Sequence, residues 1–478
     1  MKNTSGEHKK LSSSVLFRYG VGAVGEGIGY NVFFSFFSYF LTVEAGIAPA
    51  VAGLISGVAV LWDAVTDPLI GSMSDKSRNP KGRRMPYIMS GSILFGLSIA
   101  LLFFNWNLPG TLKVIYYIVI NMVYWLALTT CVVPHISLGS ELTEDFDERT
   151  KLRTWAVTLM NIGTLIAVGT PLLLVKAFTN IAGSSSAGWA AAGIIYGVLT
   201  ALVYQICCRT LKEPRNPNLD LPEEKGGVQA ALKEFFGNAK VAFRNKALGK
   251  LIAVTFFLNI MVTFGTALAI YLLTFVFGFN EEQSSLVYTL QGIFVVITAV
   301  LVGYAAQKIG KKAAMSGGIL FYIAGFLVII LLPVSWTSIV ISIALYAFGN
   351  SGYWTMIYAM SYDAAIVEQL RSGEKPDGLY TSLIGLFMKF GNALGSVLCG
   401  VGLQLIGFVE GSDVQTASAV TGIRYLYALV PSAIMVVTLF FALAYPLTRE
   451  KYASLAAALE KKQRGEPVDP AILKPYIR

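Results

Sequence analysis

The stretch "WDAVTDPLIG" (Trp62–Gly71) places two aspartates inside an apolar run that extends from Ile47 to Met73. That run is long enough to cross a bilayer, since a transmembrane helix needs roughly 20 predominantly apolar residues. A carboxylate in hydrocarbon is costly, and ionisable residues within membrane helices usually mark a functional site. The stretch therefore predicts a membrane-spanning helix with a site inside it.

The composition of the whole chain predicts an all-α polytopic membrane protein. Of the 478 residues, 55% are hydrophobic and 14% are charged, and the mean hydropathy is +0.62. Soluble domains carry about 25% charged residues. Twelve apolar segments are long enough to be transmembrane helices: 15–42, 48–74, 86–106, 112–139, 154–176, 188–210, 249–277, 284–306, 313–333, 336–360, 381–406 and 420–446.

The basic residues gather in alternate gaps between these segments. The N-terminus and the even-numbered gaps hold clusters such as Lys76–Arg84 and Lys308–Lys312, whereas the odd-numbered gaps hold only Lys113, Lys176 and Arg424. Cytoplasmic loops are enriched in lysine and arginine, so both termini are predicted to be cytoplasmic. The net charge of +9 thus reflects membrane topology, and we expect no nucleic-acid partner.

One long polar segment divides the chain into two halves. We expect an N-terminal six-helix bundle (1–210), a cytoplasmic central loop (211–247), a C-terminal six-helix bundle (248–446) and a cytoplasmic tail (447–478). Helical periodicity within the loop and the tail predicts two further helices, "VQAALKEFFGNAKVAF" (Val228–Phe243) and "YASLAAALEKKQR" (Tyr452–Arg464).

An internal repeat supports this division. "GSMSDKSRNPKGRR" (Gly71–Arg84) follows the second helix of the first half, and "GYAAQKIGKK" (Gly303–Lys312) follows the second helix of the other half. Both contain a glycine, a polar residue four positions later, and a second glycine followed by two basic residues. The repeat predicts two pseudo-symmetric bundles, the arrangement of major facilitator transporters.

Two other patterns argue against an enzyme. "GVGAVG" (Gly20–Gly25) matches a dinucleotide motif, but it lies in a predicted membrane helix and lacks the preceding strand that this motif requires. Its glycines instead allow close helix approach or leave room for a substrate. Four cysteines, all within predicted helices, and two histidines in the whole chain provide little for metal or catalytic chemistry, so we expect no cofactor.

Asp63 and Asp67 are one helical turn apart, so both carboxylates lie on one face. Pro68 disfavours helical geometry at Asp67 and could free backbone carbonyls there. Such an oxygen-rich group suits Na⁺ or another monovalent cation, or a shared proton; the alternative is a structural pair. Lys389 is the one basic residue well within a predicted helix, and it either pairs with these aspartates or extends to the membrane surface.

Other candidates line the predicted helices. Glu26 either contacts a substrate or pairs with Lys389. His135 is a further substrate-binding candidate, and its other possible roles are a proton site or a hydrogen-bonded packing residue. Trp125, Trp354, Tyr353 and Tyr358 could line a substrate cavity or serve as packing and interface residues. The charged segments Ser140–Arg153 and Tyr362–Ser382 are either solvated loops or a cytoplasmic gate between the halves. The gate candidates are Asp75, Arg83, Arg84, Glu141, Arg149 and Asp363.

Five motifs together resemble the glycoside–pentoside–hexuronide:cation symporter family, a branch of the major facilitators. They are "YGVGAVG" (Tyr19–Gly25), "WDAVTDPLIGSMSD" (Trp62–Asp75), "GRRMPYI" (Gly82–Ile88), "DERTKL" (Asp147–Leu152) and "GEKPDGLYTSLIGLFMKFGNALG" (Gly373–Gly395). The resemblance implies that Asp63 and Asp67 bind Na⁺, Li⁺ or H⁺, that Thr129 contributes to this cation site, and that Lys389 lies near it.

The sugar site of the family's melibiose-transporting members is not retained. Gly27 and Val132 stand where those transporters have two sugar-binding aspartates, and Val157 and Ile136 replace an arginine and a tryptophan. Trp354 matches the remaining tryptophan. The resemblance thus implies a retained cation site, with a substrate that is either a different sugar or not a simple sugar.

These observations predict a secondary active transporter of the inner (plasma) membrane, monomeric, that couples Na⁺ or H⁺ to symport of a sugar, glycoside or hexuronide. The rival predictions of the same fold are an uncoupled facilitator and a transporter of lysolipids or other non-sugar solutes. A sensor without transport would usually add a signalling domain, and an enzyme would need a nucleophile, base or metal cluster that this sequence does not offer.

Overall fold

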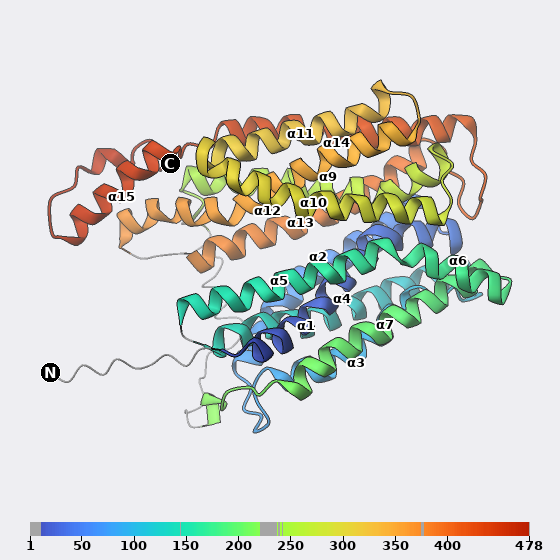
Figure 1. The fold of residues 1–478 in the computed structure, drawn as a ribbon, viewed down its shortest axis with the longest axis horizontal. Coiled ribbons are helices and arrows are strands. Elements are labelled where there is room, and N and C mark those ends of the chain that lie inside the picture. Colours follow the sequence, from blue (N-terminus) through green and yellow to red (C-terminus); the bar gives the residue numbers. More distant parts are fainter. Residues whose placement is uncertain are drawn as a thin grey trace. The chain divides into compact units, whose positions relative to one another are not determined.

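The protein is seen here in a computed structural model that describes residues 11–143, 145–219, 237, 240, 242–373 and 377–477. Figure 1 shows that the regular elements of these residues are helices. Ten of them are long and apolar enough to cross a membrane. The β-type pairing among the described residues is an isolated bridge between Asn245 and Ile477. The predicted all-α membrane fold is confirmed.

The chain forms two compact units. The first comprises Met1–Ile47 and Val58–Lys225, and the second comprises Ala48–Gly57 and Gly226–Arg478. The helices of the first unit are α1 (Ser13–Val32), α3 (Met85–Leu102), α4 (Gly110–Glu141), α5 (Phe146–Gly169), α6 (Pro171–Ala182) and α7 (Ser185–Thr210). Helix α2 (Pro49–Asp75) contributes residues to both units.

The glycines of α1 allow its backbone to approach α5. A Cβ atom added to Gly27 would collide with the Met160 carbonyl oxygen, and one added to Gly163 would collide with the Val24 carbonyl oxygen. Asn31 ties the same two helices together, because its Nδ2 donates to the Thr164 hydroxyl over 3.0 Å. The "GVGAVG" pattern therefore serves close helix packing.

The second unit repeats the helix pairing of the first. Its helices are α9 (Lys246–Tyr271), α10 (Glu281–Ile309), α11 (Lys311–Leu331), α12 (Trp336–Ser372), α13 (Asp377–Leu405), α14 (Ala417–Leu443) and α15 (Arg449–Gln463). In the first unit α1 packs against α5 and α7, and α3 packs against α4 and α7. In the second, α9 packs against α13 and α14, and α11 packs against α12 and α14. The sequence repeat thus corresponds to a structural one.

Several helix ends differ from the prediction. The fifth apolar segment is broken, because α5 ends at Gly169 and α6 begins at Pro171, whose missing N–H cannot continue the α5 hydrogen bonds. Helix α12 runs to Ser372, so the expected loop Tyr362–Ser382 is largely helical. It ends where Gly373 adopts φ +85°, a conformation that glycine provides readily.

The polar segments flanking the membrane helices are also partly helical. Helix α4 extends to Glu141 and α5 begins at Phe146, so the loop expected at Ser140–Arg153 is much shorter. The helix predicted in the tail is confirmed as α15. The helix predicted over Val228–Phe243 lies outside the described residues.

Large apolar side chains on the outer faces of the helices indicate contact with lipid. On α10, Val296 is 59% exposed, Val300 is 72% exposed and Leu301 is 52% exposed. A soluble protein rarely exposes contiguous apolar surface of this kind. In a bilayer these faces need no further cover, which agrees with a membrane-spanning bundle.

Candidate functional site

Three oxygen atoms from α2 and α4 converge within the first unit. The Thr129 Oγ1 atom lies 2.5 Å from Asp63 Oδ1 and 2.9 Å from Asp67 Oδ1. Asp63 is only 1% exposed. A hydroxyl carries one hydrogen, so Thr129 can donate fully to only one of the two carboxylates. A cation or a shared proton between the carboxylates would relieve their mutual repulsion.

Both helices that supply these oxygens contain a proline, which follows Asp63 by five residues in α2 and follows Thr129 by five residues in α4. Helix α2 continues through Pro68 and α4 continues through Pro134. Because proline has no N–H, the carbonyls four residues earlier, at Ala64 and Thr130, lose their usual helical donor. Each freed carbonyl belongs to the residue that follows Asp63 or Thr129, so the site has further oxygen atoms nearby.

Glu26 lies on α1 and is partly buried. Within the described residues of the first unit, its carboxylate makes no hydrogen bond or ion pair. The Arg153 guanidinium of α5 is near enough to interact with it electrostatically, although the sequence placed Arg153 only at the end of the charged segment Ser140–Arg153. Ionisable residues within membrane helices commonly mark substrate or ion pathways, so Glu26 stays a candidate for binding polar groups of a solute. The predicted pairing of Glu26 with Lys389, which lies on α13, stays a prediction.

His135 is a packing residue of α1 and α4. It is 1% exposed, and its ring stacks on Tyr19 with centroids 4.4 Å apart. Its Nε2 lies 3.0 Å from the Tyr19 carbonyl oxygen, which can only accept, so Nε2 donates. The Tyr19 hydroxyl in turn donates to the His135 carbonyl over 3.2 Å. These contacts are those of a hydrogen-bonded packing residue, and the roles of His135 in proton or substrate binding stay predictions.

The aromatic candidates differ in their surroundings. Trp125 is 1% exposed and packs edge-to-face on Phe33, and its buried Nε1 has no acceptor among the described residues. Tyr353 is also 1% exposed, and its hydroxyl accepts a hydrogen bond of 3.0 Å from Asn259. Trp354 is 40% exposed and is therefore the most exposed of the three.

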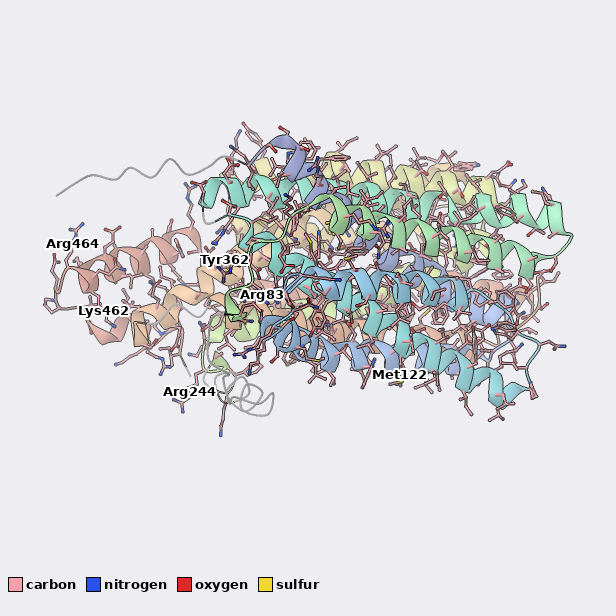
Figure 2. The ribbon with its side chains drawn as sticks, turned by 90° about the horizontal axis from the view of Figure 1, so that it is seen from below. Arg83, Met122, Arg244, Tyr362, Lys462 and Arg464 are labelled. Atoms are coloured by element: carbon pink, nitrogen blue, oxygen red, sulfur yellow. The ribbon has the colours of Figure 1, made fainter. Side chains whose placement is uncertain are left out.

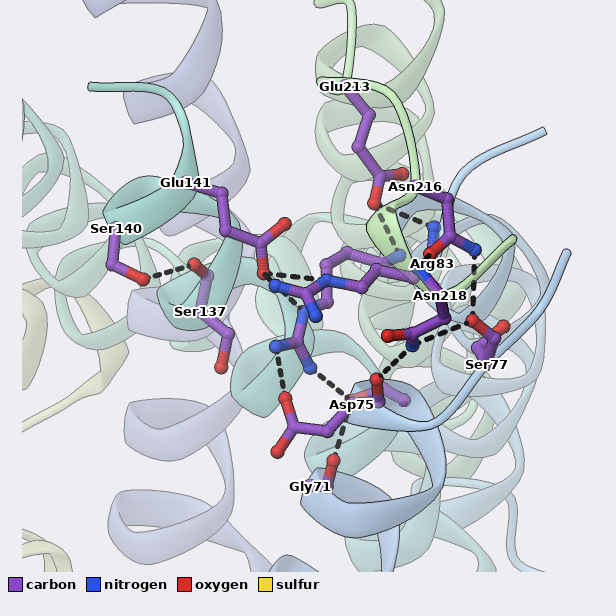
Figure 3. A network of polar contacts seen from close by, with 12 residues as sticks. Gly71, Asp75, Ser77, Arg83, Ser137, Ser140, Glu141, Glu213, Asn216 and Asn218 are labelled. Atoms are coloured by element: carbon purple, nitrogen blue, oxygen red, sulfur yellow. Dashed lines mark hydrogen bonds and ion pairs between the residues drawn. The ribbon is translucent and has the colours of Figure 1, made fainter. Parts of the chain in front are cut away.

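The predicted gate residues of the first unit form a compact network at the start of α3 (Figure 3). Arg84 is 4% exposed; its guanidinium pairs with Asp75, and its Nε donates to Glu141 Oε1 over 2.8 Å. Arg83 donates to the same Glu141 oxygen over 2.8 Å. Buried charges are tolerated when paired and hydrogen-bonded, so this network stabilises the ends of α2, α3 and α4.

The central loop completes this network through residues that the sequence did not identify. Glu213 Oε1 accepts from the Arg83 and Arg84 amides over 2.8 and 2.7 Å, and Oε2 accepts from the Met85 amide over 2.9 Å. These amides begin α3 and have no partners within the helix. Asn218 donates to the Asp75 carbonyl over 2.5 Å. The only sequence signal was one acidic residue directly after the sixth helix.

The second unit has an equivalent contact. Lys311, at the start of α11, pairs with Asp363 of α12 over 2.7 Å, just as Arg84 before α3 pairs with Glu141 at the end of α4. Arg149, the remaining gate candidate, donates to the Thr143 carbonyl over 2.8 Å. Each of these contacts lies within one unit, and the gate between the halves stays a prediction.

The repeated bundles, the lipid-facing apolar helices and the carboxylates within the membrane helices indicate the class of this protein, a membrane transporter. The chain belongs to the family described as MFS/sugar transport protein, whose model matches residues 18–449. It is 28% identical to the uncharacterized symporter YjmB of Bacillus subtilis, over 95% of this chain and 96% of that one. It is 24% identical to the isoprimeverose transporter of Lactiplantibacillus pentosus (89% and 87% covered) and 23% identical to the glucuronide carrier protein homolog of Escherichia coli (96% and 97%).

Solved structures show the same fold. A bacterial homologue of the human lysosomal transporter Spinster superposes with a TM-score of 0.65 at 17% identity, over 96% of this chain and 98% of that one. A D-xylose–proton symporter superposes with a TM-score of 0.59 at 14% identity, over 88% and 96%. The predicted major facilitator fold is confirmed, and the chain is a membrane transporter rather than an enzyme.

Proposed function

We propose that this protein couples the entry of a monovalent cation, Na⁺ or H⁺, to symport of a sugar-type solute. The observation that carries the proposal is the convergence of Asp63, Asp67 and Thr129, where one hydroxyl hydrogen serves two carboxylates. A proton or cation bound between the two carboxylates would neutralise part of their negative charge and reduce their mutual repulsion. A membrane interior makes that neutralisation strongly favourable, because unscreened charge there is costly.

The solute class rests on the relatives and on the first unit. Relatives are named as carriers of isoprimeverose and glucuronide. Glu26 offers a carboxylate that can accept hydrogen bonds from solute hydroxyls, and Arg153 on α5 can donate to them. Trp125 lies in an aromatic cluster, and its buried indole N–H has no acceptor among the described residues. This N–H would donate to a solute oxygen only in a state of the transporter that exposes the ring.

Cation and solute transport are coupled when the protein binds the solute more tightly with the cation bound than without it. Binding of Na⁺ offsets the repulsion between two ionised aspartates, whereas binding of H⁺ neutralises one of them. In either case symport requires that the occupied state bind the solute more tightly than the empty state. Alternating access then carries both ligands across the membrane together. In this mechanism Lys389 of α13 acts as a charge partner whose association with the aspartates depends on cation occupancy.

Solute accumulation in proteoliposomes tests the proposal. Pentosides, glucuronides and isoprimeverose are added one at a time outside vesicles that contain the wild-type protein, under an imposed inward Na⁺ gradient or pH gradient. We expect one gradient to drive accumulation, and Asp63→Asn and Asp67→Asn to abolish accumulation or uncouple it. Asp413→Asn, at an exposed loop position, is the matched control and should behave as wild type. Full accumulation by both site variants would contradict the proposal.

A further inference from the structure

A cavity of about 400 Å³ lies where α9 begins and α14 ends. Its wall includes two lysines from the first turns of α9, one aromatic ring of α14, an alanine and a proline that follow α14, and a proline of the C-terminal segment. These are Lys246, Lys250, Phe441, Ala444, Pro446 and Pro475. The cavity therefore combines positive charge with an apolar surface, and it is separate from the cation site on α2 and α4.

The C-terminal segment is held in place as part of this wall. The Lys246 amide donates to the Tyr476 carbonyl over 2.8 Å, and Ile477 pairs with Asn245 as an antiparallel bridge. Tyr476 is only 6% exposed. Pro475, directly before it, is thereby fixed against the start of α9, so the cavity has a defined shape in the folded protein.

The backbone amides at this end of α9 already have acceptors. Asn245 Oδ1 accepts from the Ala247 and Leu248 amides over 2.9 and 3.3 Å, and the Asn245 Nδ2 donates to Tyr380 of α13 over 3.0 Å. An anion in the cavity would therefore be bound by the lysine side chains rather than by the helix terminus.

The two lysines carry positive charge that the described residues do not balance. Lys246 and Lys250 are one turn apart on the same face of α9, and neither forms an ion pair within the described part of the chain. Like charges at this spacing repel. The Lys250 Nζ atom lies 5.1 Å from the Phe441 ring centroid and 5.8 Å from that of Phe440. A bound anion between the two ammonium groups would remove the repulsion.

The position of the cavity favours a membrane lipid as the source of such an anion. It lies at the ends of two membrane-spanning helices, beside Phe440, which is 65% exposed. Arg244 projects outward near this end of the second unit (Figure 2), and Lys474, next to Pro475, is exposed. Charge asymmetry predicts that this end faces the cytoplasm, where the leaflet carries anionic lipids.

We propose that this cavity binds the headgroup phosphate of an anionic membrane phospholipid. Lys246 and Lys250 hold the phosphate oxygens, and Phe441, Pro446 and Pro475 contact the glycerol and the first methylenes. A free phosphate ion carries similar negative charge but would make no contact with these apolar residues. A lipid contacts both the lysines and the apolar wall, so the lipid is the favoured source of the phosphate. Because the wall includes the C-terminal segment, a bound lipid also fixes that segment to α9.

Native mass spectrometry of the full-length protein tests this site. The purified protein is titrated with phosphatidylglycerol, or with phosphatidylcholine of the same acyl chains, and the retained lipids are counted. We compare Lys246→Gln/Lys250→Gln with Lys308→Gln/Lys461→Gln, which removes two lysines of the same unit outside the cavity. Each surface lysine contributes about 1 kcal/mol to anionic lipid binding, so the cavity variant should bind about 25-fold more weakly.

The outcomes distinguish a bound lipid from nonspecific charge attraction and from free phosphate. Preferential retention of phosphatidylglycerol by the wild type and by the Lys308/Lys461 variant, with loss in the cavity variant, supports the site. Lys246→Arg/Lys250→Arg should restore binding, which excludes loss through misfolding. Equal weakening in both double variants would show nonspecific charge attraction and overturn the proposal. Displacement of the lipid by millimolar inorganic phosphate, with equal thermal stabilisation by phosphate alone, would overturn the lipid as the occupant.

Discussion

The hydroxyl of Thr129 connects two carboxylates that belong to one face of α2. Its oxygen is within hydrogen-bond distance of both Asp63 and Asp67, yet it has a single hydrogen to donate. Which carboxylate accepts this hydrogen therefore depends on whether a cation or a proton is bound between them. We thus expect single substitutions in the site to change cation binding while leaving the surrounding helices unchanged.

Thr129→Ala should weaken the apparent affinity for the coupling cation about tenfold or more, because it removes a hydroxyl that contacts charged groups. Thr129→Ser keeps that oxygen and should retain most of the affinity. The measurement is the cation concentration that gives half-maximal solute uptake. Thr130→Ala is the control, since the Thr130 hydroxyl donates to the Leu126 carbonyl over 2.7 Å; a tenfold loss in this variant would show a general defect of α4.

Glu26→Gln should raise the KM for the solute with little effect on the cation concentration for half-maximal uptake. The substitution keeps the size of the side chain but removes a charged acceptor, and hydrogen bonds to charged groups are about twice as strong as neutral ones. Uptake measured at saturating cation and varied solute isolates this effect. A changed cation dependence with an unchanged solute KM would assign Glu26 to the cation site instead.

At the scale of helices, two contacts between distant segments hold the first unit together: the cap of α3 by Glu213 and the close packing of α1 against α5. Helix α3 begins at Met85, and its first amides are bound by Glu213, a residue from beyond the end of α7. Gly82 has φ +123°, and a Cβ atom there would collide with the Glu213 carboxylate. The second contact is that of α1 with α5 through Gly27 and Gly163.

Glu213→Ala should lower the stability of the purified protein by about 1–2 kcal/mol, because it leaves three amides at the start of α3 without an acceptor. Thermal unfolding in detergent measures the loss. Glu410→Ala, which removes an exposed acidic side chain, should have little effect. Equal melting temperatures for Glu213→Ala and the wild type would show that the cap is dispensable.

Gly163→Ala should destabilise the protein by about 1–3 kcal/mol, the usual cost of overpacking, because the new methyl group meets the Val24 backbone and separates α1 from α5. Gly317→Ala in α11 is the control, since no atom lies within 4 Å of its added Cβ, and alanine favours helix over glycine. We expect the melting temperature to fall for the first variant and to stay equal or rise for the second. A rise for both would contradict the packing interpretation.

At the scale of the whole molecule, the sequence predicted the fold because apolar segments of membrane-spanning length and a repeated motif are local signals. The spacing of Asp63 and Asp67 likewise indicated a shared face, although Thr129 came only from family resemblance. Helix ends were mispredicted where polar residues remain good helix formers outside the membrane, as at the end of α12. The cap by Glu213, the packing of His135 and the docking of Tyr476 depend on contacts between distant segments, which no local pattern reveals.

The repeated pairing of helices bears on mechanism at the same scale. Each unit joins the start of its third helix to the C-terminal part of its fourth through an ion pair, Arg84–Glu141 in the first and Lys311–Asp363 in the second. Such contacts hold the ends of each bundle as a unit, which suits transport by movement of whole bundles rather than of single helices.

Solute-driven ion flux tests the central claim most directly. Proteoliposomes without an imposed ion gradient are mixed with isoprimeverose, a glucuronide or another pentoside, while indicators inside report Na⁺ and pH. Coupling is reciprocal, so we expect a transported solute to carry Na⁺ or H⁺ inward in the wild type and not in Asp63→Asn. Solute entry into wild-type vesicles without movement of either ion would contradict symport and identify an uncoupled facilitator.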